Sequence, residues 1–137
     1  MKRVIQADCL NCGKEIPRKP NIYCSMDCRA KHMYSKSVKQ WLAGEHPGHY
    51  GDQVADFVRR YIFKKYNSRC TKCGWHEINP TTGKIPLTIE HKDGNSQNTI
   101  ESNLDLLCPN CHSLTSTYGA LNKGNGRQER QSKRMRV

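Results

Sequence analysis

Apolar and polar positions follow two different periods in the second half of the chain. Between residues 52 and 66, apolar side chains recur at helical spacing and predict an amphipathic helix. Residues 85–91 alternate in the manner of a β-strand. Residues 103–112 lead into a second short helix, because Pro109 is tolerated in the first turn of a helix. Together these elements predict a small α+β domain.

The pattern is less regular before this region and after it. Residues 35–42 predict a short amphipathic helix, and residues 44–51 are rich in glycine and proline, which indicates a loop. The histidines of that loop, His46 and His49, are expected to be exposed. We therefore interpret residues 35–56 as a linker. Residues 128–137 are basic and almost without apolar side chains, which predicts a disordered tail.

Eight cysteines compensate for a composition that cannot build one large core. Only 35% of the 137 residues are hydrophobic and 7% are aromatic. The chain shows neither a signal peptide nor an apolar run near the ~20 residues of a membrane span. A cytoplasmic, reducing location is expected, where structural disulfides are rare. Zinc is therefore favoured over disulfides, which remain the alternative.

The cysteines fall into two sets of four, each with the spacing of a zinc site. The first set lies within residues 1–34, which predicts an N-terminal four-cysteine zinc finger. In the second set, two close pairs are 34 residues apart and would pin the predicted strand to the final helix. Four thiolates leave no open coordination position, so both ions would be structural. The two sets are Cys9, Cys12, Cys24, Cys28 and Cys70, Cys73, Cys108, Cys111.

The net charge of +11, from 23 Lys and Arg against 12 Asp and Glu, indicates a polyanionic partner. Nucleic acid is the favoured partner, and a plain gain in solubility or a ribosome-like environment is the alternative. Several basic residues lie on the predicted helix and in the C-terminal segment, where they could contact phosphates. They are Arg59, Arg60, Lys64, Lys65, Lys123 and Arg127.

Three side chains with catalytic potential lie next to the second cysteine set. Glu90 and His91 end the predicted strand, and His112 directly follows Cys111. Neighbours on a strand point to opposite faces, so Glu90 and His91 can aim at one point only where the strand ends. A zinc ion joining strand and helix would let the three side chains converge. Taken singly, each could instead be a structural histidine or a surface charge.

Two segments here resemble the HNH nuclease motif in its zinc-knuckle form. They are residues 87–95 and 103–112, in which His91, Asn103 and His112 take the three namesake positions. Residues 115–127 are similar to the segment that follows the motif in small phage HNH endonucleases, including free-standing homing enzymes. The N-terminal four-cysteine unit also resembles an accessory finger of some phage members.

The resemblance implies a ββα-metal (His-Me finger) fold for residues 57–127 and a one-metal hydrolysis of phosphodiester bonds in double-stranded DNA. His91 would be the general base. His112 and Glu90 would hold one Mg²⁺ or Mn²⁺ ion, with Asp93 as the alternative carboxylate. Asn103 would fix the loop that carries the base through hydrogen bonds to the backbone.

A different class of function uses the same zinc and charge. A double zinc-finger protein would bind nucleic acid without cutting it, and a nuclease acting on RNA would share the chemistry. Only an enzyme needs Glu90, His91, Asn103 and His112 together, which favours the DNA endonuclease. A monomer is expected, located in the host cell cytoplasm if a phage encodes it.

Overall fold

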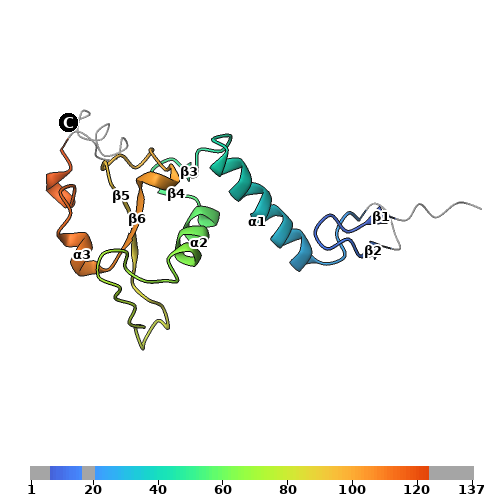
Figure 1. Cartoon of the computed structure of the whole chain (residues 1–137), viewed down its shortest axis with the longest axis horizontal. Coiled ribbons are helices and arrows are strands. Elements are labelled where there is room, and N and C mark those ends of the chain that lie inside the picture. The colour runs from blue at the N-terminus through green and yellow to red at the C-terminus, as the bar shows by residue number, and fades with distance from the viewer. Residues whose placement is uncertain (1–6, 17–20, 124–137) are drawn as a thin grey trace, which may run out of the picture. The chain divides into compact units, whose positions relative to one another are not determined.

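The computed structural model describes residues 7–16 and 21–123. The chain divides into two compact units, residues 1–40 and 41–137, and the elements confirm the predicted small α+β class (Figure 1). No helix within the described ranges is long and apolar enough to cross a membrane. The predicted tail, residues 128–137, lies outside the described residues.

The first unit is built around a tight turn between two short strands. Strand β1 (Ala7–Asp8) pairs with β2 (Glu15–Ile16) in antiparallel fashion. The turn between them closes through Gly13, whose φ of 73° favours glycine. Helix α1 (Met26–Leu42) then begins after Ser25, whose Oγ accepts a hydrogen bond from the N–H of Cys28 at 3.1 Å. This contact satisfies a free N–H at the start of the helix.

Helix α1 includes residues 35–42, so the predicted short helix is the second half of a longer one. Its penultimate residue, Trp41, is 5% exposed and belongs to the second unit. The Trp41 Nε1 donates a hydrogen bond to the carbonyl of Thr99 at 2.7 Å, and its ring lies 5.3 Å from that of Tyr61. The predicted linker therefore supplies a core residue of the second unit, because burial of a tryptophan is strongly favourable.

A two-stranded hairpin follows where a loop was predicted. Strand β3 (His49–Tyr50) pairs with β4 (Gln53–Val54), and the two-residue turn Gly51–Asp52 connects them. His46 and His49 are both half-buried rather than exposed. The bounds of the domains stay a prediction, but residues 41–56 contribute structure to the second unit.

The rest of the second unit consists of a helix packed on a β-hairpin, and a short helix follows the hairpin in the chain. Helix α2 spans Asp56–Lys65, strand β5 Thr88–His91, strand β6 Leu104–Leu107 and helix α3 Pro109–Ser113. Short 3-10 helices lie at Glu101–Asn103 and Gly119–Leu121.

Strands β5 and β6 are antiparallel, with Glu90 opposite Asp105 and His91 opposite Leu104. Helix α2 packs on β6, and α3 contacts both strands (Figure 1). The core consists mainly of aliphatic side chains from α2 and the hairpin. They include Val58, Ile62, Ile89, Leu104, Leu106 and Leu107.

Gly48→Ala is expected to lower the free energy of unfolding by about 2–4 kcal/mol. A Cβ atom there would lie 2.6 Å from Nε1 and 2.7 Å from Cδ1 of Trp41, at a φ of 77°. The Trp41 ring cannot move away without losing its hydrogen bond to the carbonyl of Thr99. Urea unfolding measures the loss. Gly83→Ala is the matched control, since Gly83 has a φ of 68° but open space around it. Equal losses for the two variants would contradict the close packing of Trp41.

Candidate active site

The second cysteine set holds the β5–β6 hairpin, the 70–74 turn and α3 together. Its four Sγ atoms lie within 4.8 Å of one another, and those of Cys73 and Cys108 are 3.7 Å apart. Zn–S bonds of ~2.3 Å in a tetrahedron place sulfurs about 3.8 Å apart, so the set fits zinc. The N–H of Cys111 points to the Sγ of Cys108 at 3.4 Å, and Gly74 closes the turn with a φ of 75°.

The first cysteine set has the same arrangement in the first unit. Its four Sγ atoms also lie within 4.8 Å of one another. The Sγ of Cys24 is 3.6 Å from that of Cys12 and 3.5 Å from that of Cys28. All eight cysteines are free thiols. Both sets are therefore compatible with structural zinc sites, as the spacing predicted.

Glu90 and His112 meet beside the second cysteine set. The Nδ1 of His112 lies 2.8 Å from the Oε2 of Glu90, and the two side chains are 29% and 12% exposed. The other carboxylate oxygen, Oε1, accepts a hydrogen bond from the Thr117 hydroxyl at 2.7 Å. The ring of Tyr118 stands edge-on to that of His112, with centroids 5.1 Å apart. Residues 117–118 thus fix both partners of the pair.

This pair fits the donor set of a divalent ion. The Nδ1 of His112 is buried and makes no aligned hydrogen bond with any described residue, although the Glu90 oxygen is close. Neighbouring ligands of an octahedral ion at ~2.1 Å are about 3 Å apart, which matches the 2.8 Å separation. The Thr117 hydroxyl donates to one carboxylate oxygen of Glu90, and the other oxygen faces His112. An imidazole nitrogen and a carboxylate oxygen are both common ligands of divalent metal ions in proteins.

His91 lies at the end of β5 and lines the same cleft as Glu90 and His112. Its Nε2 is 3.5 Å from the hydroxyl of Thr99. Burial lowers the pKa of His91 below its ordinary value, and the nearby carboxylates of Asp93 and Glu90 oppose that shift. A neutral imidazole, the form that can accept a proton, is therefore the main species at neutral pH.

Asn103 ties the loop after His91 to the start of β6. Its Nδ2 donates to the Oδ1 of Asp93 at 2.9 Å and to the carbonyl of Asn98 at 2.7 Å. Its Oδ1 accepts from the N–H of Asp93 at 3.2 Å. Desolvation raises the pKa of Asp93, but the hydrogen bonds from Asn98, Asn95 and Asn103 together outweigh it, so the pKa is lowered below its ordinary value. The Asp93 carboxylate is therefore occupied by hydrogen bonds within the loop, whereas the Glu90 carboxylate lies beside His112.

Asn103→Ala is expected to lower the free energy of unfolding by about 2–4 kcal/mol, because it removes the three hydrogen bonds that this buried side chain makes with Asp93 and with the carbonyl of Asn98. Urea unfolding provides the measurement. Asn95→Ala is the matched control, since the exposed Asn95 side chain accepts a single hydrogen bond, from the N–H of Gln97. A loss below 1 kcal/mol for both variants, the typical range of exposed sites, would show that the loop does not depend on Asn103.

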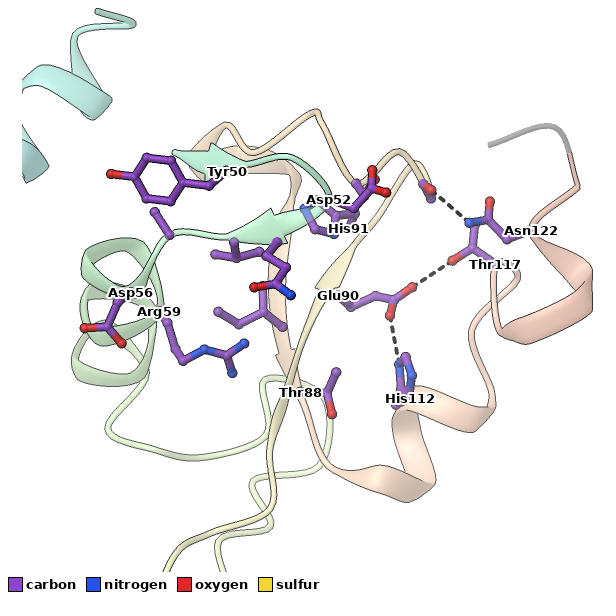
Figure 2. A pocket seen from close by; sticks show the side chains of 16 residues that line it. Tyr50, Asp52, Asp56, Arg59, Thr88, Glu90, His91, His112, Thr117 and Asn122 are labelled. Atoms are coloured by element: carbon purple, nitrogen blue, oxygen red, sulfur yellow. Dashed lines mark hydrogen bonds and ion pairs between the residues drawn. The ribbon is translucent and has the colours of Figure 1, made fainter. Parts of the chain in front are cut away.

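Glu90, His91 and His112 line an open cleft of about 770 Å³ (Figure 2). The β3–β4 hairpin contributes Tyr50 and Asp52 to its wall, and α2 contributes Arg59. Figure 2 shows the Arg59 side chain extending from α2 into the cleft. Arg59 is the one lysine or arginine among the described residues that line it. A phosphate group entering the cleft would therefore meet a single permanent positive charge.

The other basic residues predicted to contact phosphates lie in different environments. Arg60 lines a neighbouring groove, and Lys64 and Lys123 are exposed. The Nζ of Lys65 is engaged by the carboxylate of Glu101 at 2.6 Å. Arg127 lies outside the described residues.

One comparison with known proteins bears on this geometry. The chain is 48% identical over 56 residues to the H-N-H endonuclease F-TflIV of Escherichia phage T5. This match supports assignment to the HNH endonuclease family. The matched part is 41% of this chain and 24% of that protein, so the chain spans about a quarter of its relative's length. The family resemblance predicted from the HNH motif is thereby borne out. No family model matches the chain, and neither does any solved structure.

Two parts of the cleft were not predicted from the sequence. Thr117 lies in the segment that was likened to phage HNH endonucleases, but nothing local indicates its contact with Glu90, 27 residues away. The β3–β4 hairpin does carry a local signal, because Gly51–Asp52 is a two-residue turn sequence typical of tight hairpins.

Proposed function

We propose that this chain is a metal-dependent HNH endonuclease that hydrolyses phosphodiester bonds in double-stranded DNA. The contact between Glu90 and His112, together with the placement of His91 along the same open cleft, carries this proposal. The nuclease domain would comprise residues 57–127, with the ββα-metal arrangement formed by β5, β6 and α3. Residues 1–34 would act as a zinc finger that adds contacts to DNA, and the protein would act as a monomer.

His91 is the general base in this proposal. It accepts a proton from the attacking water through its neutral imidazole. Thr99 and the loop held by Asn103 keep the ring oriented. Asn103 therefore acts as a positioning residue, which does not touch the phosphate.

Glu90 and His112 hold one divalent ion, Mg²⁺ or Mn²⁺, and Thr117 and Tyr118 keep the two ligands in place. When bound, such an ion stabilises the negative charge that develops on the phosphate and the leaving oxygen. Arg59 binds the phosphate from the opposite side of the cleft, where its guanidinium supplies paired donors. The two zinc ions stay structural.

The reaction is tested with the full zinc-loaded chain and a supercoiled plasmid. Added Mg²⁺, or Mn²⁺ if Mg²⁺ fails, is expected to yield nicked or linear plasmid, and EDTA applied briefly enough to leave zinc bound is expected to stop the reaction. Zinc content is measured in the same samples. An intact plasmid under both ions, with DNA binding retained, would reject the endonuclease in favour of a non-catalytic zinc-finger protein.

A further inference from the structure

A second hollow of about 1060 Å³ shares Arg59 with the cleft. Helix α2 forms one wall, and the loop between the 70–74 turn and β5 forms the other. Its lining combines apolar and cationic side chains, and no described residue that lines it is acidic. The apolar residues are Phe63, Ile78, Ile85, Pro86 and Leu87, and the cationic ones are Arg59, Arg60 and Lys84.

The outer wall of this groove is preformed. The Oδ1 of Asn79 accepts hydrogen bonds from the N–H groups of Thr81 at 2.9 Å and Thr82 at 3.2 Å. The N–H of Asn79 donates to the carbonyl of Lys84 at 2.9 Å, which closes the loop on itself. Ile78 is nevertheless 62% exposed. A fixed loop that presents a large apolar side chain next to cations is suited to a ligand with both apolar and anionic parts.

Arg59 connects this groove to the catalytic cleft, because its side chain lines both hollows. Its guanidinium makes no hydrogen bond or ion pair with the described part of the chain. A polymer with regularly spaced negative charges that enters the cleft can therefore continue past Arg59 into the groove. A separate small anion would not require this continuity.

We infer that the groove binds the DNA strand that flanks the cleavage site. Arg59, Arg60 and Lys84 would contact successive phosphates, and the Ile78 side chain would pack against deoxyribose. This inference rests on the proposed function for the nature of the ligand. A strand of DNA matches the groove better than an apolar peptide, because the described residues that line it include three positive charges and no negative one.

The inference is tested by DNA binding, separately from cleavage. Affinity for a mixed-sequence duplex is measured over a range of salt concentrations, with the zinc-loaded full chain and no added Mg²⁺ or Mn²⁺. Lys84→Ala is expected to reduce the slope of log K against log salt by about 0.9, the loss of one phosphate contact. Ile78→Ser is expected to weaken binding about fivefold with the slope unchanged.

Lys72→Ala is the matched control, because the exposed Lys72 lies outside both hollows. It is expected to leave affinity and slope at wild-type values. Unchanged binding by Lys84→Ala and Ile78→Ser would overturn the inference, and so would an equal effect of Lys72→Ala. A protein that shows the groove effects but does not cut plasmid would reject the endonuclease and keep the groove. A protein that cuts plasmid but shows no groove effects would reject the groove and keep the endonuclease.

Discussion

His91→Ala is expected to lower the rate of DNA cleavage by about 10²–10⁴-fold, the usual contribution of a general base. The alanine removes the nitrogen that accepts the water proton, but it leaves Glu90 and His112 in contact with each other. His91 makes one long contact, 3.5 Å to Thr99, so the fold should lose little. Single-turnover cleavage of a plasmid measures the rate, and thermal unfolding measures the stability.

The control for this prediction is His76→Ala. His76 is an exposed histidine beside the 70–74 turn that contacts Arg69 and the carbonyl of Gly74, and it does not line the cleft. This variant is expected to cut at the wild-type rate. A His91→Ala variant that also cut at the wild-type rate, or a His76→Ala variant that lost as much activity, would exclude His91 as the base.

Removal of zinc from the second cysteine set is expected to unfold the second unit. Apparent binding free energies of ~10–16 kcal/mol for structural zinc are as large as the whole stability of a small domain, about 5–15 kcal/mol. The 70–74 turn joins β6 through the N–H of Thr71 and the carbonyl of Leu106, at 2.8 Å. The thiolates would otherwise repel one another at these distances. Cys108→Ser and chelation should therefore both abolish cooperative unfolding of this unit.

Cys12→Ser is the matched control for the zinc prediction, because Cys12 belongs to the first unit. It should lose one of two zinc ions and leave the unfolding transition of the second unit in place. Circular dichroism follows the transition, and a colorimetric assay counts the zinc released. Full cooperative unfolding of Cys108→Ser without bound zinc, under reducing conditions, would contradict the structural role of the ion.

Local patterns in the sequence predicted α2, β5 and α3 of the second unit, but not the β3–β4 hairpin. Helical spacing predicted a helix over residues 52–66, and α2 spans Asp56–Lys65, because Gln53–Val54 form strand β4 instead. The alternating stretch 85–91 became strand only from Thr88 onward. Pro86 has no N–H to donate to a sheet, which explains why the ladder begins after it.

Other features depend on contacts between residues distant in sequence, which no local pattern reveals. Helix α1 extends to Leu42 because Trp41 packs in the core of the second unit. There it donates a hydrogen bond to Thr99, 58 residues away in sequence, and its ring contacts that of Tyr61 on α2. The orientation of Glu90 depends on Thr117, across two elements. The sequence placed Glu90, His91 and His112 near the second cysteine set, whereas the contacts that orient them, such as that of Thr117 with Glu90, required the three-dimensional structure.

The most direct test of the account separates the roles of the histidines by their dependence on metal. Single-turnover cleavage is measured against Mn²⁺ concentration for wild type, His91→Ala, His112→Ala and Glu90→Gln. His91→Ala should lower the maximal rate but reach half of that rate at the same Mn²⁺ concentration as wild type. His112→Ala and Glu90→Gln should need at least tenfold more Mn²⁺, since each removes one of the two protein ligands. Wild-type Mn²⁺ dependence in both ligand variants would contradict a catalytic ion held by Glu90 and His112.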